Sequence, residues 1–336
     1  MRIFMDNSIL CLQQRGGIST YWNEVLKVTM HKDLDVVTNA KLVRRLARIM
    51  NRIDFLAPLL TLLLKLCPII LSNRCEIVHT SYYRRPWFGF KGLYVITIHD
   101  MIPEMYFTGL QRKLAVFYKR RAILRADRLI CVSDTTKKDL LRFYPGIDRA
   151  MVTTIHHGSR KSVMSLKERN VNQILYIGRR SEKYKGFMKL VRSLKNSNYT
   201  LVIVGSALTK TEKSEVQKVL HNRFVSMVFP TNQTVDALLK SSIALLYPSE
   251  YEGFGLPVLE AMSLGTPVVC NDTKVFRELF SDAAIFTNFE DSGQVLASLN
   301  LVKERLNEIS QKCIELNERY SWDKSRSEHV SLYLKK

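Results

Sequence analysis

Cysteine is scarce in this 336-residue sequence, which counts against a disulfide framework or a zinc site. The six cysteines include no C-x-x-C pair, and no His/Cys cluster has zinc-ligand spacing. In a chain of this size they are expected to be reduced, mostly buried thiols, which favours a reducing cytosol. The N-terminal stretch 1–6 lacks the long apolar run of a signal peptide and predicts a short strand.

Acidic residues are also in short supply, because 31 Asp and Glu face 51 Lys and Arg, a net charge of +20. Residues 1–170 hold 29 basic and 13 acidic residues, a net charge of +16, whereas residues 171–336 hold 22 and 18, a net charge of +4. The first half is therefore expected to meet an anionic partner: nucleic acid, an anionic membrane or a phosphorylated substrate. Charge alone does not choose among these partners.

Short apolar runs alternate with helical stretches along the chain, whose hydrophobic fraction of 46% excludes a disordered or collagen-like protein. Such alternation predicts parallel sheets covered on both faces, and two sets of six strands predict two doubly wound α/β domains. Their join is expected between residues 157 and 172, with a ligand site in the cleft between the domains. The expected strands are 2–5, 36–38, 75–79, 93–99, 128–133 and 152–156, then 173–178, 200–205, 225–229, 243–248, 267–271 and 283–286.

The segment 41–71 departs from this alternation. On a helical wheel its first part has basic residues within an arc of about 100° and apolar residues on the other side, as in helices that lie on anionic membranes. The apolar stretch 55–71 contains Lys65, Pro58 and Pro68, so a membrane-spanning helix is not expected. The alternative is a domain helix with a solvated basic face. The basic residues of the arc are Lys41, Arg44, Arg45, Arg48 and Arg52.

A second basic run is expected to be a solvated helix face, with contact to phospholipid or a lipid-linked diphosphate as the alternative. The run Arg84-Arg85-Pro86-Trp87-Phe88 mixes cations and aromatic residues after a strand end, and its role is left open between gripping a sugar or a lipid headgroup and capping a loop. The second basic run consists of Arg112, Lys113, Lys119, Arg120, Arg121, Arg125 and Arg128.

The stretch 248–262, with the sequence PSEYEGFGLPVLEAM, carries the most chemical information. A buried strand is expected to end at Pro248, and a glycine-containing loop leads into a helix with Pro257 at its first position and Gly265 as its stop. Backbone N–H groups at such a helix start can face a phosphate, and Gly253 and Gly255 let the backbone come close to it.

Two glutamates in this stretch suit a sugar nucleotide. Glu260, expected in the first helical turn, can accept hydrogen bonds from the adjacent hydroxyls of a ribose. Glu252, at the mouth of the loop, can accept from sugar hydroxyls. Each glutamate taken alone is also explained by the helix dipole, which favours acidic residues in a first turn.

The whole string resembles the signature of retaining glycosyltransferases of family 4 (glycosyltransferase group 1), which have the GT-B fold of two Rossmann-like domains facing a central cleft. Its hallmark is two glutamates separated by seven residues, here Glu252 and Glu260. The resemblance covers nearly the whole chain. Its other matches are the glycine loop 15–21, the His-Asp strand end at 97–103, the strand ends at 131–134 and 155–158, and the Arg…Lys motif from 176 to 186.

The resemblance implies a role for each matching position. Glu260 would bind the donor ribose, Arg179 and Lys185 would neutralise the diphosphate, and Glu252 would hold the transferred sugar. His99 would lie near the sugar, and Asp100 near the sugar or the acceptor. Further donor contacts would come from Gly16, Gly17, Gly253, Phe254, Gly255 and Leu256. Two departures from the family pattern are Gly186, where Asn is usual, and His157, where Asn is frequent.

No metal and no other cofactor is expected. Breaking a glycosyl–phosphate bond develops negative charge on the diphosphate, which two cations and a helix N-terminus can stabilise. The triplet Asp33-Leu34-Asp35 matches the short Asp-x-Asp pattern of metal-dependent transferases, but no other metal-ligand motif lies nearby, so it is interpreted as chance.

These observations predict a cytoplasmic, retaining hexosyltransferase, peripherally bound to the inner face of the plasma membrane. It would move a sugar from a UDP- or GDP-sugar to a glycan or lipid-linked acceptor in bacterial-type surface polysaccharide or lipopolysaccharide assembly. Residues 1–160 would form the acceptor and membrane side, residues 161–320 the donor domain, and residues 321–336 a helix returning to the first domain. The alternatives are a nucleotide-sugar epimerase or phosphorylase on the same fold, or a basic nucleic-acid-binding protein, which the scattered aromatic residues disfavour.

Overall fold

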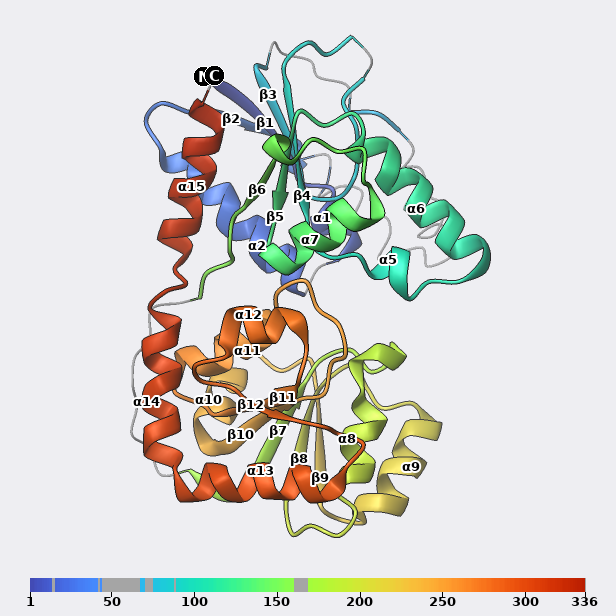
Figure 1. The fold of residues 1–336 in the computed structure, drawn as a ribbon, viewed down its shortest axis with the longest axis vertical. Helices are drawn as coiled ribbons and strands as arrows, with labels where there is room; N and C mark the ends of the chain where they lie inside the picture. Colours follow the sequence, from blue (N-terminus) through green and yellow to red (C-terminus); the bar gives the residue numbers. More distant parts are fainter. Residues whose placement is uncertain are drawn as a thin grey trace. The chain divides into compact units, whose positions relative to one another are not determined.

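The chain forms two compact units, Met1–His157 with Trp322–Lys336, and Gly158–Ser321 (Figure 1). The computed structural model describes residues 1–13, 16–41, 43, 67–69, 75–87, 89–159 and 169–335. Most of the basic amphipathic helix expected at 41–71 lies outside the described residues, as does Arg15 of the glycine loop. The C-terminal segment belongs to the N-terminal unit.

A six-stranded parallel sheet in the order β2-β1-β3-β4-β5-β6 forms the centre of the N-terminal unit. All six strands expected from the sequence are present, and β3 and β4 are buried at almost every position because helices cover the sheet. The strands are β1 (Arg2–Asp6), β2 (Asp35–Thr38), β3 (Ile77–Thr80), β4 (Leu93–Ile98), β5 (Arg128–Cys131) and β6 (Val152–Thr154).

The last helix of the chain completes the core of the N-terminal unit, where it packs against the first long helix (Figure 1). Its His329 and Tyr333 are buried, and His329 Nε2 lies 2.8 Å from Tyr21 Oη. The helices of this unit are α1 (Ile9–Leu12), α2 (Gly17–Val25), η1 (Leu26–Met30), α5 (Ile102–Met105), α6 (Gly109–Ile123), α7 (Asp134–Phe143), η3 (Arg149–Met151) and α15 (Trp322–Leu334).

The second unit repeats the architecture with a parallel sheet in the order β12-β11-β10-β7-β8-β9. Its six expected strands are also present: β7 (Asn170–Ile177), β8 (Thr200–Gly205), β9 (Phe224–Val228), β10 (Ser242–Tyr247), β11 (Val268–Asn271) and β12 (Ile285–Thr287). The helices are η4 (Lys183–Lys185), α8 (Phe187–Ser193), α9 (Lys210–Leu220), α10 (Asn232–Ser241), α11 (Leu256–Ser263), α12 (Lys274–Phe280), α13 (Ser292–Glu304) and α14 (Leu306–Asn317). The prediction of two doubly wound α/β domains is confirmed.

None of the six cysteines forms a disulfide, and Cys11, Cys131, Cys270 and Cys313 are buried. Burial raises the pKa of the Cys313 thiol to about 12, so this side chain remains a neutral thiol at physiological pH. Among the helices that the structure describes, none is both long enough and apolar enough to cross a bilayer.

Candidate functional site

The strand order of the second unit reverses between β7 and β10, which pair side by side although β8 and β9 separate them in the sequence. In open α/β sheets, ligands bind outside the carboxyl ends of the strands at such a reversal. The loop that follows β7 supplies Lys185, and the loop that follows β10 supplies Glu252. The topology therefore brings together two residues that are 67 positions apart.

Lys185 and Glu252 form an ion pair in this place. Lys185 Nζ donates to Glu252 Oε1 at 2.5 Å, and Tyr247 Oη donates to the same oxygen at 2.8 Å. The two charged side chains are only 16% and 12% exposed, so the pair is largely screened from water. Glu252 Oε2 accepts no hydrogen bond from any residue that the structure describes, which leaves this oxygen for a ligand.

Tyr247 was not singled out from the sequence, although it is the last residue of a buried strand. Burial, and the negative charge of Glu252, raise the pKa of the Tyr247 hydroxyl well above its usual value. The hydroxyl therefore stays protonated and acts as a hydrogen-bond donor to Glu252. A polar residue at the carboxyl end of a central strand is the sequence signal that could have identified it.

Close backbone packing fixes the two loops against each other. Gly186 has φ +66°, and a Cβ atom there would lie 2.3 Å from the carbonyl oxygen of Pro248. Glu250 N donates to the carbonyl of Tyr184 at 2.8 Å, and Asn271 Nδ2 donates to the carbonyl of Pro248. Because only glycine fits this contact, the departure from the family pattern at Gly186 places Lys185 rather than disturbing it.

The helix α11 begins after the glycine-containing loop that follows β10, as expected, but it starts one residue earlier than predicted. Gly255 is its N-cap, with φ +101° and no side-chain cap, so the first N–H groups of the helix have no capping side chain. Leu256 is the first helical residue and is buried, and Pro257 is the second, so the expectation of Pro257 in first place is wrong by one residue. Gly265, with φ +66°, ends the helix as predicted.

Glu260 lies in the second turn of α11, not in the first turn as expected, and its side chain is exposed. The helix starts at residue 256, so five positions separate the carboxylate from the N-cap. Phe254 is buried, with its ring at right angles to those of Phe280 and Tyr320. The Phe254 ring therefore packs in the core of the unit and does not face a ligand.

Of the two arginines after β7, Arg179 has an exposed side chain and Arg180 a buried one. Arg180 Nη2 donates to the carbonyls of Ser206 and Ala207 at 2.6 and 2.9 Å, and its Nε lies 3.3 Å from Glu212 Oε1. Arg180 thus ties the loop after β8 to the end of β7. The structure leaves the expected Arg179 free to reach a ligand and gives its neighbour a supporting role that the sequence did not reveal.

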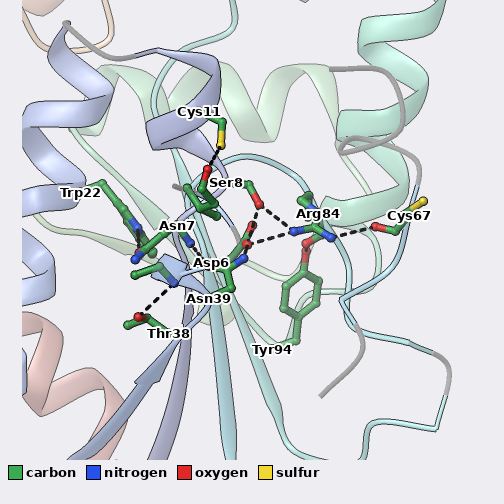
Figure 2. Close-up of polar contacts among 12 residues, drawn as sticks. Asp6, Asn7, Ser8, Cys11, Trp22, Thr38, Asn39, Cys67, Arg84 and Tyr94 are labelled. Atoms are coloured by element: carbon green, nitrogen blue, oxygen red, sulfur yellow. Dashed lines mark hydrogen bonds and ion pairs between the residues drawn. The ribbon is translucent and has the colours of Figure 1, made fainter. Parts of the chain in front are cut away.

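In the N-terminal unit the strand order reverses between β1 and β3, and a buried polar cluster lies there (Figure 2). Arg84 Nη1 donates to Asp6 Oδ1 at 3.0 Å and to Ser8 Oγ at 2.7 Å, and Asn39 Nδ2 donates to the same Asp6 oxygen at 2.6 Å. The Tyr94 hydroxyl donates to the Arg84 carbonyl at 2.5 Å. The arginine whose role the sequence left open therefore anchors the segment after β3 to the ends of β1 and β2.

His99 lies at the carboxyl end of β4, with its ring at right angles to that of Tyr21 and 5.0 Å away. Burial, together with the charge of Lys119, lowers the pKa of His99 to about 3, so the imidazole is neutral. Its Nε2 is buried without a hydrogen-bond partner in the described part of the chain. Asp100 Oδ1 accepts from Ile102 N at 3.0 Å, so this predicted catalytic carboxylate shapes the turn into α5.

Lys119 is buried, which contradicts the expectation that the whole second basic run forms a solvated helix face. Its side chain is 1% exposed, and its Nζ donates to Glu104 Oε2 at 2.9 Å and to the carbonyl of Asp100 at 2.6 Å. Tyr144 Oη donates to the other Glu104 oxygen at 2.7 Å, so the buried charges are paired and hydrogen-bonded. In the same run, Arg112, Lys113, Arg120 and Arg121 are exposed as predicted.

The glycine loop precedes α2, which has Gly16 as its N-cap and Gly17 as its first residue. Gly16 has φ +150°, and a Cβ there would lie 2.5 Å from the side chain of Gln13. In the Asp-x-Asp triplet, Asp35 is paired with Arg2 at 2.6 Å. Within the described ranges, no group of three or more His, Cys, Asp and Glu residues could hold a metal ion.

Comparisons with known proteins agree with this architecture. The model of the family "Glycosyltransferase Family 4" matches residues 20–159, and that of "Glycosyl transferases group 1" matches residues 160–318. The O-antigen chain mannosyltransferase RfbU of Salmonella typhimurium is 26% identical over 222 residues, which are 64% of this chain and 62% of the relative. The chain therefore matches less than two thirds of that relative's length.

Solved structures of glycosyltransferases share the fold over their whole length. Sucrose-phosphate synthase from Thermosynechococcus elongatus superposes with a TM-score of 0.72 at 16% identity, over 99% of this chain and 98% of that one. Anabaena HepE, solved in complex with UDP and glucose, superposes with a TM-score of 0.63 at 16% identity, over 99% of both chains. The identity is low, so these likenesses establish the fold alone.

Proposed function

This chain belongs to the glycosyltransferases of group 1 and family 4, and from that premise we propose that it transfers a hexose from a nucleoside diphosphate sugar to a glycan or lipid-linked acceptor. One observation carries the proposal: Lys185 and Glu252 meet beside the uncapped start of α11, at the strand reversal of the second unit. A cation and a carboxylate beside the N-terminus of a helix suit a phosphate with a sugar attached.

Lys185 would stabilise the diphosphate leaving group. Its ammonium has three N–H donors, of which Glu252 uses one, so Lys185 can hold a phosphate oxygen without leaving the carboxylate. The exposed Arg179 would supply the second cation, and the N–H groups that start α11 would add partial positive charge. The negative charge that develops on the diphosphate is thereby neutralised by the chain itself, which is why we propose a metal-independent reaction.

Glu252 would orient the transferred sugar. With Oε1 occupied by Lys185 and Tyr247, its Oε2 can accept a hydrogen bond from a sugar hydroxyl. Glu260 would bind the ribose from the second turn of α11. We propose that His99, Asp100, Gly16 and Gly17 of the N-terminal unit also take part in transfer, and that transfer retains the configuration of the anomeric carbon.

The donor is proposed to be a UDP- or GDP-hexose. HepE was solved with UDP and glucose, and RfbU is named as a mannosyltransferase, so glucose and mannose are both candidate hexoses to test. The name of RfbU also refers to the O-antigen chain, and surface polysaccharide or lipopolysaccharide assembly is proposed for this protein on that ground. The similar proteins are glycosyltransferases, which disfavours the epimerase, phosphorylase and nucleic-acid-binding alternatives.

We further propose that the protein works in the cytoplasm, at the inner face of the plasma membrane. The support is the charge asymmetry, since residues 1–170 carry 29 basic and 13 acidic residues. A polybasic surface gains about 1 kcal/mol per Lys or Arg near an anionic leaflet.

Titration of UDP and GDP into the purified protein tests the donor site. Lys185→Ala is expected to weaken the preferred nucleotide about 10- to 100-fold, the range for loss of one charge-assisted hydrogen bond. Lys183→Ala is the matched control, because Lys183 is an exposed lysine two positions earlier in the same short helix. Equal affinity of the wild type and Lys185→Ala for both nucleotides contradicts the proposal, as does donor epimerisation without an acceptor.

A further inference from the structure

One exposed face of α6 carries large apolar side chains. Leu110, Leu114 and Phe117 are 70%, 43% and 50% exposed, and Leu124, just after the last turn, is 60% exposed. At about 100° per residue these four side chains, here called the α6 ridge, lie within an arc of about 80°. The buried residues Lys119, Ala122 and Ile123 lie on the opposite side of the helix. The exposed Arg121 falls within the same arc, so the ridge combines exposed apolar side chains with a cation. Exposed apolar side chains gathered on one face indicate an interaction surface.

Basic side chains lie within and beside the α6 ridge. Lys113, Arg120 and Arg121 are exposed, and the Arg121 guanidinium lies 5.3 Å from the centre of the Phe117 ring. Between residues 109 and 128 the chain has seven basic residues and one acidic residue, Asp127. In Figure 1, α6 lies at the margin of the N-terminal unit, on the side away from α15. The surface therefore combines exposed hydrocarbon with one sign of charge.

We propose that the α6 ridge docks on an anionic phospholipid bilayer, with its apolar side chains at the headgroup level and the flanking cations on lipid phosphates. Long basic side chains suit this boundary because their hydrocarbon stems lie against apolar surface while their charges stay in water. A second copy of this chain fits less well, because self-association would place the cations of two ridges against each other. The inference rests on the proposed membrane setting and is independent of the proposed reaction.

Co-sedimentation of the full-length protein with vesicles tests the surface. Wild type is expected to bind vesicles of phosphatidylglycerol and phosphatidylcholine and to bind phosphatidylcholine alone weakly. The double variant Leu114→Ser with Phe117→Ser is expected to lower the partition coefficient about tenfold or more, because two apolar side chains no longer enter the interface. Leu301→Ser, an exposed leucine on α13, is the matched control and should bind like wild type.

A second pair of variants isolates the charge contribution. Lys113→Glu with Arg120→Glu is expected to weaken binding to anionic vesicles and to reduce its dependence on salt. The control Lys213→Glu with Lys218→Glu makes the same charge change at exposed positions of α9 and should leave binding nearly unchanged. Loss of binding in both pairs to the same extent would indicate overall charge rather than this face and would overturn the proposal.

Three further results would overturn it: no binding of wild type to anionic vesicles, undiminished binding of the Leu114→Ser, Phe117→Ser variant, or loss of binding only when Arg44, Arg45 and Arg48 are changed to Ser. A wild-type dimer that this ridge variant dissociates, with unchanged vesicle binding, would assign the ridge to self-association instead. UDP and GDP titrations separate this inference from the proposed function. Vesicle binding without nucleotide binding leaves the docking surface standing and contradicts the transferase proposal, whereas the converse does the opposite.

Discussion

Lys185 and Tyr247 donate hydrogen bonds to the same oxygen of Glu252, at 2.5 and 2.8 Å. One donor comes from the loop after β7 and the other from the last residue of β10, so the strand reversal itself orients the carboxylate. The arrangement leaves the second carboxylate oxygen open to a ligand. Substitution of Lys185 or of Tyr247 removes one of these two hydrogen bonds to Glu252 and leaves the other.

Glu252→Gln keeps the shape of the side chain and removes its charge. Because we place Glu252 on the transferred sugar and not on the nucleotide, kcat for transfer is expected to fall about 100-fold, while the affinity for UDP or GDP stays within about threefold or tightens. Initial-rate kinetics and nucleotide titration measure the two quantities. Glu250→Gln is the control, since Glu250 lies on the same loop as Glu252 and is paired with Lys189 of α8. Parallel loss of nucleotide affinity and of kcat would place Glu252 on the nucleotide.

Tyr247→Phe removes one donor to Glu252 without changing the packing of the ring. The freed carboxylate is expected to turn more easily, so kcat should fall about tenfold with little change in KM, in line with loss of a hydrogen bond to a charged group.

Tyr199→Phe is the matched control for this change, because Tyr199 is a buried tyrosine of the same unit whose hydroxyl has no hydrogen-bond partner among the residues that the structure describes. It should leave kcat unchanged. If Tyr247→Phe behaves like Tyr199→Phe, Tyr247 does not position Glu252.

Gly186→Ala is expected to destabilise the second unit. The backbone at residue 186 has φ +66°, and the new methyl group would lie 2.3 Å from the Pro248 carbonyl oxygen. Strain of this kind costs about 1–3 kcal/mol, and the displaced loop should also weaken nucleotide binding. Urea denaturation measures the loss against Gly146→Ala, where a Cβ would meet no atom within 4 Å. Equal stability of the two variants would show that the loop contact is not as tight as described.

The N-terminal unit is expected to lose stability in mild acid. Burial lowers the pKa of His99 to about 3 and of His329 to about 4, and lowers those of His79 and His157 well below their usual range. In the unfolded chain these histidines protonate near pH 6.5. Below that pH the unfolded chain therefore binds more protons than the folded chain, and unfolding is favoured. Each such histidine then costs about 1.4 kcal/mol of unfolding free energy at pH 5.5.

Thermal unfolding between pH 7.5 and pH 5.5 checks this expectation. His329→Asn should reduce the change in melting temperature with pH, whereas His31→Gln, at a partly exposed histidine, should not. A melting temperature that is independent of pH over this range would contradict neutral burial of the histidine cluster.

The sequence predicted the strands and the positions of the glycines well, because apolar runs and left-handed turns are encoded locally. The meeting of Lys185 with Glu252 also followed from a family signature, although the third partner, Tyr247, did not. Side-chain burial was harder to predict. In the sequence, Lys119 is one of the seven cations of the second basic run, and its pairing with Glu104 arises only in the folded chain. Arg179 and Arg180 are adjacent in the sequence, and their division into an exposed and a buried residue depends on the loop after β8.

A crystal structure of the chain with an intact UDP- or GDP-hexose would test directly whether Lys185 and Glu252 bind the donor. We expect a phosphate oxygen within about 3 Å of Lys185 Nζ and a sugar hydroxyl donating to Glu252 Oε2, with Tyr247 still bound to Oε1. A nucleotide bound away from the ends of β7 and β10, or a sugar that makes no contact with Glu252, would contradict it.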